Sequence, residues 1–418
     1  MKILKYIFSI DNIDEKVFIS VLGINFKFNR PKSEPKYILE HIFCYFIHLF
    51  FKVKKNKIVF INLTNWQYAD NPKYIANEFL KSDNKKLDFV WIRNMGTDRT
   101  LIPKRFRIVK YLSLKALFEM MTAKVWVINA NPFLLYKKGL LKNKETVCIQ
   151  TWHGSMGIKR ESNDVKNNKA YESLGWAKWQ KIVAANTDYF IADSKFEEVF
   201  YKSAFWGYGN VVKLGKARDV IFYENQIDFI DKIKSYYNIP SENKILLYAP
   251  TWRTDKRCDC YNIDIRLLKK TLRQKYNCDW SVLIRPHYLM PKEIFNALYD
   301  INEVINVSAY PDMQELLVAS DMLISDYSSC IPEYTILKKP SFIYATDIDK
   351  YENGFYYPLS TLPSPVSTDN GELTQQILNL NIYDFKVNCD KFLLSMGHEN
   401  DINCCKRIVE FILKVMNG

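Results

Sequence analysis

From residue 57 onward, short apolar runs alternate with longer stretches of mixed polarity. Apolar runs separated by helical stretches are typical of α/β proteins with parallel sheets. The pattern predicts a first set of strands at 57–63, 87–92, 124–129, 146–151, 189–192 and 211–214. It predicts a second set at 244–248, 280–284, 303–306, 322–325 and 341–344. We therefore expect an α/β protein with two comparable halves.

The stretch between the two sets of strands, 225–243, is polar, has a helical pattern and contains Pro240 near its end. Because proline interrupts helices, this is a reasonable place for a domain boundary. Apolar residues at helical spacing predict a closing helix over 400–416. We divide the 418 residues into an appendage (1–56), a first domain (57–238) and a second domain with the closing helix (239–418).

The first 56 residues have a different pattern. Alternating apolar and polar residues over 16–28 predict a small hairpin. The apolar stretch 37–51 is too short and too polar to span a bilayer, and a run of lysines follows it: Lys52, Lys54, Lys55 and Lys57. We expect a helix that either lies on an anionic membrane surface or packs on the protein with a solvated basic end. Because the start has no uninterrupted apolar segment, we do not expect secretion.

The charge of the chain favours an anionic partner. Lysine and arginine number 59 against 46 acidic residues, which gives a net charge of +13. Two basic clusters, 99–110 and 137–144, lie in the first half and predict a surface that faces a membrane or a polyanion; a solvated charged face is the alternative. The nine cysteines are dispersed without metal-ligand spacing, which is typical of a reducing cytosol.

Polar residues follow four of the predicted strands. Ligands of parallel sheets bind beyond the carboxyl ends of the strands, so these residues are the candidate site. They include His153 with Gly154, Thr251 with Arg253, Arg285 with His287, and Asp326 with Ser328 and Ser329. Two domains that present such groups to each other predict one phosphate-handling cleft between them.

His153 is the candidate general base. An imidazole can accept a proton from an alcohol near neutral pH, and Gly154 lets a ligand approach closely. A hydrogen-bonded structural histidine is the alternative. His287 could donate to a phosphate oxygen while Arg285 supplies positive charge; a salt-bridged loop end is the alternative interpretation.

The hydroxyl groups of Ser328 and Ser329 stand where a helix is expected to begin, an arrangement that binds anions without a metal. Simple N-capping by Asp326 or Ser328 is the alternative. The chain has neither a Walker loop nor a Gly-x-Gly-x-x-Gly fingerprint. Asp347 and Asp349 could suggest a metal site of the Asp-x-Asp kind, but no other candidate ligands are nearby, so we predict no metal and no cofactor.

Taken together, these motifs resemble those of the CDP-glycerol glycerophosphotransferase family, which includes teichoic-acid primases and polymerases and their capsule-polymer relatives. The matching pieces occur in family order: Asp70-Asn71-Pro72, Gln150 to Gly154, Tyr248 to Arg253, Arg285-Pro286-His287, Ser325 to Ser329, and Lys339-Pro340 leading to Asp347 and Tyr351. The resemblance implies a GT-B fold, in which two Rossmann-like domains face a cleft.

The resemblance also implies roles for individual residues. His153 and His287 are the implied catalytic residues. The donor would contact Thr251, Arg253, Arg285, Asp326, Ser328, Ser329 and Glu333. The acceptor side would comprise Asp70, Asn71, Gly154, Ser155 and Lys159. The chain departs from the family pattern at 155–160, at 215–219 and at Glu333, where aspartate is usual, and these departures leave the acceptor and the polyol open.

The resulting hypothesis is transfer of a polyol phosphate, with glycerol phosphate favoured, from a CDP-alcohol to a hydroxyl of a cell-surface glycan or lipid-linked acceptor. Such an enzyme of teichoic-acid or capsule synthesis would be peripheral on the cytoplasmic face of the bacterial membrane. The alternatives are a GT-B glycosyltransferase that uses a nucleotide sugar and a non-catalytic module that binds a polyanion or a membrane. Nucleic acid is not expected as a partner, because no reader motif is present.

Overall fold

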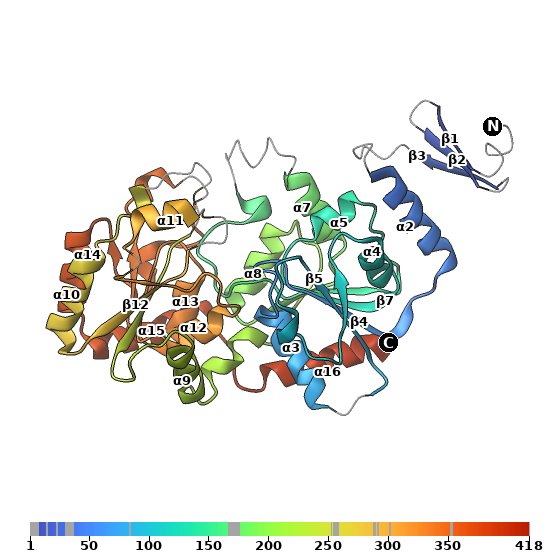
Figure 1. Cartoon of the computed structure of the whole chain (residues 1–418). Coiled ribbons are helices and arrows are strands. Elements are labelled where there is room, and N and C mark those ends of the chain that lie inside the picture. Colours follow the sequence, from blue (N-terminus) through green and yellow to red (C-terminus); the bar gives the residue numbers. More distant parts are fainter. Residues whose placement is uncertain are drawn as a thin grey trace.

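The structure is a computed structural model of the 418-residue chain. It describes residues 8–13, 16–21, 24–29, 37–82, 85–165, 176–251, 253, 259–286, 290, 292–300, 302–351 and 354–417. Two parallel sheets with helices on both faces form two halves that lie side by side (Figure 1). We call the part around the first sheet the first half and the part around the second sheet the second half.

The first sheet has seven parallel strands in the order β10-β9-β8-β7-β4-β5-β6. Their bounds are β4 (Lys54–Ile61), β5 (Asp88–Arg93), β6 (Arg107–Lys110), β7 (Ala123–Ile128), β8 (Val147–Gln150), β9 (Tyr189–Ala192) and β10 (Asn210–Lys213). The central strand β4 buries five consecutive residues from Lys57 to Ile61. Such runs are expected where helices cover both faces of a parallel sheet.

The second sheet has six parallel strands in the order β13-β12-β11-β14-β15-β16. Their bounds are β11 (Lys244–Ala249), β12 (Trp280–Ile284), β13 (Ile305–Asn306), β14 (Met322–Ser325), β15 (Ser341–Tyr344) and β16 (Val366–Ser367). The order has the 3-2-1-4-5-6 pattern of Rossmann sheets, and six strands of the first sheet repeat it. The order reverses between β4 and β7 and between β11 and β14, which are the places where such sheets bind ligands.

The described helices cover these sheets and connect their strands (Figure 1). Their bounds are α2 (Ile38–Phe50), α3 (Asp70–Lys81), α4 (Leu114–Met121), α5 (Phe133–Lys137), α7 (Trp176–Ala185), α8 (Lys195–Ala204), α9 (Ile227–Tyr236), α10 (Ile265–Tyr276), α11 (Lys292–Leu298), α12 (Met313–Ala319), α13 (Cys330–Tyr334), α14 (Asn370–Asn379), α15 (Ile382–Met396) and α16 (Cys404–Asn417). Local sequence sets several ends. Ser194 caps α8 through its side chain, and left-handed Gly397 ends α15.

The closing helix α16 leaves the second half and packs against α3 and β7 of the first half (Figure 1). The return begins after Gly397, whose carbonyl accepts a hydrogen bond from the backbone N–H of Lys195 at 3.1 Å. A short helix η4 (Ala217–Phe222), which precedes the second half in sequence, contacts α3, α12 and α16. The division into three domains remains a prediction, but the chain enters the second half and comes back.

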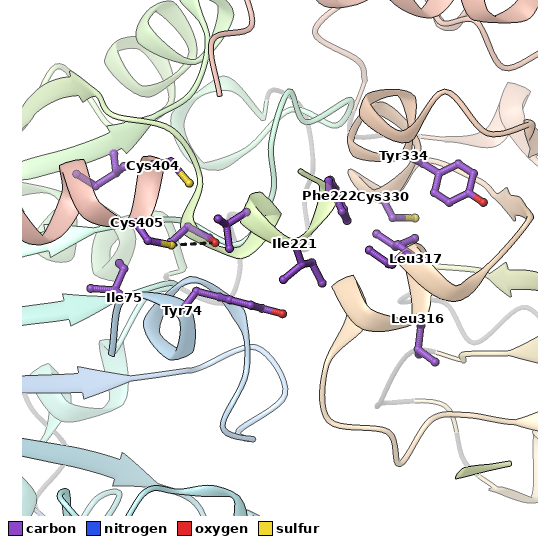
Figure 2. Close-up of a cluster of buried hydrophobic side chains, with 14 of the residues drawn as sticks. Tyr74, Ile75, Ile221, Phe222, Leu316, Leu317, Cys330, Tyr334, Cys404 and Cys405 are labelled. Atoms are coloured by element: carbon purple, nitrogen blue, oxygen red, sulfur yellow. Dashed lines mark hydrogen bonds between the residues drawn. The ribbon is translucent and has the colours of Figure 1, made fainter. Parts of the chain in front are cut away.

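One hydrophobic core runs through both halves. Figure 2 shows Tyr74 and Ile75 of α3 beside Ile221 of η4, with Leu317 of α12 on the other side. The same core includes Cys405 of α16, whose thiol donates to the carbonyl of Ala217 at 3.5 Å. Because η4 packs against both groups of helices, it fixes how the two halves meet.

The predicted N-terminal hairpin is present as β2 (Lys16–Val21) and β3 (Ile24–Asn29), and β1 (Phe8–Ile13) adds a third antiparallel strand. Helix α2 buries Cys44 and Ile47 against the first half, where it packs on α4. Its other face exposes large apolar side chains, namely Leu39, Phe46, Leu49 and Phe50. Across the described ranges, the helices are too short or too polar for any of them to cross a bilayer.

Candidate active site

A cavity of about 450 Å³ lies where the carboxyl ends of the two sheets meet. Residues that follow β4 and β8 line it from the first half, and residues that follow β11, β12 and β14 line it from the second. The sequence-predicted residues that line it are Asp70, His153, Gly154, Lys159, Thr251, Arg285, Ser328, Ser329 and Glu333. The structure thus brings most of the predicted site together in one cavity.

His153 faces this cavity with one defined tautomer. Its Nδ1 atom lies 3.0 Å from the carbonyl oxygen of Asn129, which can only accept a hydrogen bond. Nδ1 therefore holds the proton, and the lone pair is left on Nε2. Burial lowers the pKa of His153 to about 4, although the nearby carboxylate of Asp70 acts in the opposite direction. The imidazole is therefore neutral at pH 7 and able to accept a proton.

Strained backbone positions hold this wall of the cavity. Asp70 and Trp152 both have positive φ, at 61° and 57°. Asn71 connects them, because its side-chain amide donates to the carbonyl of Trp152 at 3.0 Å and accepts from the backbone N–H of Arg218 at 3.0 Å. Asn71 is buried beneath the cavity. It connects α3 and η4 to the loop after β8 that carries His153, which we call the His153 loop.

The His153 loop touches the second half at Gly154. A Cβ atom at this position would lie 2.8 Å from the Oγ of Ser329, so only glycine fits without movement. The next residue, Ser155, donates its backbone N–H to Glu333 Oε1 at 2.7 Å, and its hydroxyl donates to Asp193. Ser155 is therefore buried behind the cavity wall. Glu333 of the second half binds this loop through the hydrogen bond from the Ser155 backbone.

Arg218 lies at the centre of a buried group of carboxylates. It contacts Asp70 at 3.3 Å, Glu333 through a short ion pair, and Asp219 at 3.8 Å. The side-chain amide of Gln314 donates to Glu333 Oε2 at 3.0 Å and to Asp219 Oδ1 at 3.3 Å. Burial, reinforced by the charge of Glu333, raises the pKa of Asp219 well above its ordinary value. One arginine thus connects both halves at the cavity.

On the second half, Asp326 organises the loop after β11. Its carboxylate accepts from the backbone N–H of Thr251 at 3.1 Å and from its hydroxyl at 2.8 Å. Arg253 pairs with the same carboxylate at 2.8 Å and with Asp347 Oδ2 at 2.6 Å. Arg253 is buried, has two anionic partners and is absent from the cavity wall. Thr251 faces the cavity, whereas Asp326 and Arg253 support it.

Arg285 differs from Arg253 in its partners. Its guanidinium donates to the carbonyls of Tyr310 at 2.8 Å and Val307 at 3.3 Å. Within the described ranges it has no carboxylate partner, although it lines the cavity. Burial lowers the pKa of Arg285. A half-buried cation with only neutral acceptors is a strong attractor for an anionic ligand.

The other predicted residues divide by location. His287 lies outside the described residues. The carboxylate of Asp347 forms an ion pair with Arg253. Within the described ranges, no group of three or more potential metal ligands occurs. Residues on the wall that the sequence analysis did not select include Thr64, Asn65, Glu161, Arg218 and Gln314. Thr64 and Asn65 follow β4, so the strand-end rule could have found them.

Two Rossmann-like parallel sheets that face each other across one cavity define a two-domain fold of the GT-B-like class. The family model described as CDP-Glycerol:Poly(glycerophosphate) glycerophosphotransferase matches residues 43–414. The chain belongs to this family, as the sequence motifs predicted.

Similar proteins include two named teichoic acid poly(glycerol phosphate) polymerase. The one from Staphylococcus epidermidis is 32% identical over 78% of this chain and 46% of its own length, and the one from Bacillus subtilis is 30% identical over 80% and 45%. The chain thus spans about half the length of these relatives. A teichoic acid glycerol-phosphate transferase from Staphylococcus aureus is 30% identical over 80% of this chain and 87% of its own.

Solved structures of the wall teichoic acid polymerase TagF are similar in fold. One of them, from a crystal soaked with CDPG, superposes with a TM-score of 0.77 at 27% identity and covers 91% of this chain and 96% of its own. This likeness confirms the predicted α/β architecture with two facing halves.

Proposed function

We propose that this protein transfers a polyol phosphate, with glycerol phosphate favoured, from a CDP-alcohol to a hydroxyl of a cell-surface glycan or lipid-linked acceptor. One observation carries the proposal: Arg285, without a carboxylate partner in the described chain, shares a cavity with neutral His153. A base and an unpaired cation are what attack of an alcohol on a diphosphate requires. The named activities of the similar proteins support the same reaction.

The transfer step balances as an in-line displacement at the β-phosphorus. His153 Nε2 takes the proton of the acceptor hydroxyl while its oxygen forms a bond to the β-phosphorus. The bond between that phosphorus and the oxygen bridging to the α-phosphorus breaks, and CMP leaves with the bonding electron pair. The carboxylate of Asp70 stabilises the imidazolium that forms, because it already raises the affinity of His153 for a proton.

The donor diphosphate would lie against the second half. Arg285 supplies charge, and the hydroxyl groups of Ser328 and Ser329 supply hydrogen bonds from the same wall. Thr251 shapes this wall, but its hydroxyl proton is already donated to Asp326. Asp326 and Arg253 act on the donor indirectly, because they hold Thr251 in place. His287, which follows Arg285 by two residues, is proposed as a second group for the phosphates.

The acceptor would approach from the first half, where Asp70, Gly154 and Lys159 line the cavity. We propose that no metal is needed, because Arg285 and Lys159 place positive charge where a divalent ion would otherwise act. Activity in EDTA tests this point. If EDTA abolished turnover and manganese restored it, the metal-independent reaction would be wrong.

We propose that the protein works on the cytoplasmic face of the membrane. The exposed apolar face of α2 and the basic residues that follow it suit an interfacial helix on an anionic surface. A lipid-linked acceptor would then reach the cavity from that surface.

The decisive experiment measures nucleotide release from the purified full chain with CDP-glycerol, CDP-ribitol and several UDP-sugars. We expect CMP release that depends on an acceptor and is fastest with CDP-glycerol. Faster UDP release would replace the proposal with a glycosyltransferase. No release from any donor, together with full biological function of His153→Ala, would indicate a non-catalytic module.

A further inference from the structure

A second cavity, of about 1020 Å³, lies at the opposite edge of the first sheet. Its lining includes residues at the starts of β4, β7, β8 and β9, whereas the reaction cavity lies beyond the strand ends. The last turns of α16 form the other side. We call this cavity the basal groove. It is separate from the site of transfer and has no role in the reaction described above.

Four lysines from four different segments converge on the basal groove: Lys55, Lys124, Lys144 and Lys414. We call them the groove lysines. None of them has an ion-pair partner in the part of the chain that the structure describes, and Glu145 is the acid among the described lining residues. Unbalanced positive charge in a concave surface raises the local concentration of anions.

The remaining surface of the basal groove is largely apolar. Phe411 and Tyr189 meet edge to face with ring centroids 5.0 Å apart, and Val147, Val415 and Leu87 lie among the other lining residues. A groove with cations at its rim and apolar side chains within it matches an amphiphile better than a free inorganic ion. Such a ligand has an anionic phosphodiester next to hydrocarbon.

The basal groove is also close to the exposed face of α2. Phe51 remains 41% exposed directly after that helix, and Lys55 follows four residues later. A fully extended chain of four residues spans at most about 14 Å, so the two surfaces are neighbours. The sequence between them adds Lys52 and Lys54, which continues the positive charge from the helix to the groove.

We propose that the basal groove binds the headgroup of an anionic phospholipid, with the phosphodiester on the groove lysines and the start of the acyl chain on the apolar surface. Helix α2 and the basal groove then contact one membrane together, α2 by apolar burial and the groove by charge. The proposal adds a lipid site to the proposed function and does not depend on which donor or acceptor the reaction cavity takes.

The test is sedimentation of the full chain with vesicles of phosphatidylcholine alone and with phosphatidylglycerol added. For the double variant K144Q/K414Q we expect roughly fivefold weaker binding per lysine on phosphatidylglycerol vesicles, and no change on phosphatidylcholine. The matched control K270Q/K386Q removes the same charge from exposed helix positions of the second half. It should weaken binding by less than about twofold, because distant charges are screened.

Three results would overturn the proposal. The first is equal binding of K144Q/K414Q and the unaltered protein to phosphatidylglycerol vesicles. The second is an equal loss in the control variant, which would show that net charge alone acts. The third is a K144Q/K414Q variant that no longer binds soluble poly(glycerol phosphate) chains but still binds vesicles. The groove would then be a site for the polymer.

Release of CMP from CDP-glycerol with a soluble acceptor separates this proposal from the proposed function. K144Q/K414Q should retain full CMP release, because the groove lysines lie at the far edge of the sheet. The variant F46S/F50S on α2 serves as a second comparison: it should weaken binding to both kinds of vesicle, whereas the groove variant should weaken only the part that depends on phosphatidylglycerol.

Discussion

The carbonyl oxygen of Asn129 and the Nδ1 atom of His153 lie 3.0 Å apart, and this contact fixes which ring nitrogen faces the cavity. Asn129 directly follows β7 and His153 follows β8, so two neighbouring strands set the tautomer of this imidazole. A backbone carbonyl cannot lose this role through side-chain substitution. Protonation of Nδ1 is therefore built into the sheet itself.

Substitution of His153 tests the assignment of the base. We expect His153→Ala to lower kcat for CMP release by about 10² to 10⁴-fold, because proton removal from the acceptor is lost. Donor affinity should change little. Isothermal calorimetry with CDP-glycerol and a turnover assay measure the two quantities, and His48→Ala on exposed α2 is the control. A fall in kcat of less than tenfold would contradict the base assignment.

The pH dependence of kcat/KM follows from the low pKa of His153. With His153 proposed as the base, the neutral imidazole should be the active form, and burial holds the pKa of His153 at about 4. Activity should therefore stay constant as pH falls from 7 and decline only with a midpoint near 4, well below the usual histidine value of about 6.5. A midpoint near 6.5 in the kcat/KM profile would show that His153 is not buried as described or is not the base.

The contact between Gly154 and Ser329 predicts a sharp steric effect. Gly154→Ala places a methyl group 2.8 Å from Ser329 Oγ and should lower the free energy of unfolding by about 1–3 kcal/mol. Ser329→Gly in the same chain should restore much of this loss, since it removes the atoms that clash. Urea unfolding measures both variants. Gly157→Ala is the control, because no atom lies within 4 Å of its added Cβ.

Arg253 and Arg285 should behave differently when truncated. Arg253→Ala leaves Asp326 and Asp347 without their cation and should cost about 3–5 kcal/mol of stability. Arg285→Ala should retain stability and raise the KM for the CDP-alcohol at least tenfold. Thermal unfolding and CMP-release kinetics distinguish the two. If Arg285→Ala bound CDP-glycerol normally, Arg285 would not be the donor's cation.

Asp219 should tolerate a neutral replacement. A carboxyl whose pKa is raised in the folded state binds its proton more tightly there than in the unfolded chain, so its contribution to stability falls as pH rises above about 4. At pH 7, Asp219→Asn should therefore be at least as stable as the unaltered protein, and the difference should grow toward higher pH. Glu333→Ala should lose stability, because it removes the side chain that accepts from Arg218 and from the Ser155 backbone N–H. Urea unfolding at several pH values checks both.

The sequence predicted the fold well because parallel strands that are buried on both faces have continuous apolar runs. All eleven strands predicted in the two sheets agree with the structure within about three residues at either end. Strands β6 and β16 were missed because neither shows an apolar run: β6 (Arg107–Lys110) has a charged residue at each end and one buried position, and β16 has two residues. The family motifs supplied the GT-B arrangement, which hydropathy alone does not contain.

The candidate site was only partly predictable. Position after a strand places a residue at the right edge of the sheet, as for His153 and Thr251, but it does not give the direction of the side chain. Arg253 is an example: it follows a strand as predicted, but its side chain pairs with Asp326 and Asp347 and does not line the cavity. Arg218 and Gln314 come from η4 and α12, and they reach the cavity only because the halves meet there. Contacts between halves leave no periodic signal in the sequence.

The return of α16 to the first half makes the second half an insertion between two junctions. Helix α9 already packs against α12 of the second half, so one junction lies before Ile227. The other lies at Gly397, where the chain pairs again with the first half. The second half of a relative could therefore be exchanged as a single segment with two points of fusion. Any such chimera must keep α16 of the present chain. This helix follows the second half in sequence but completes the core of the first half.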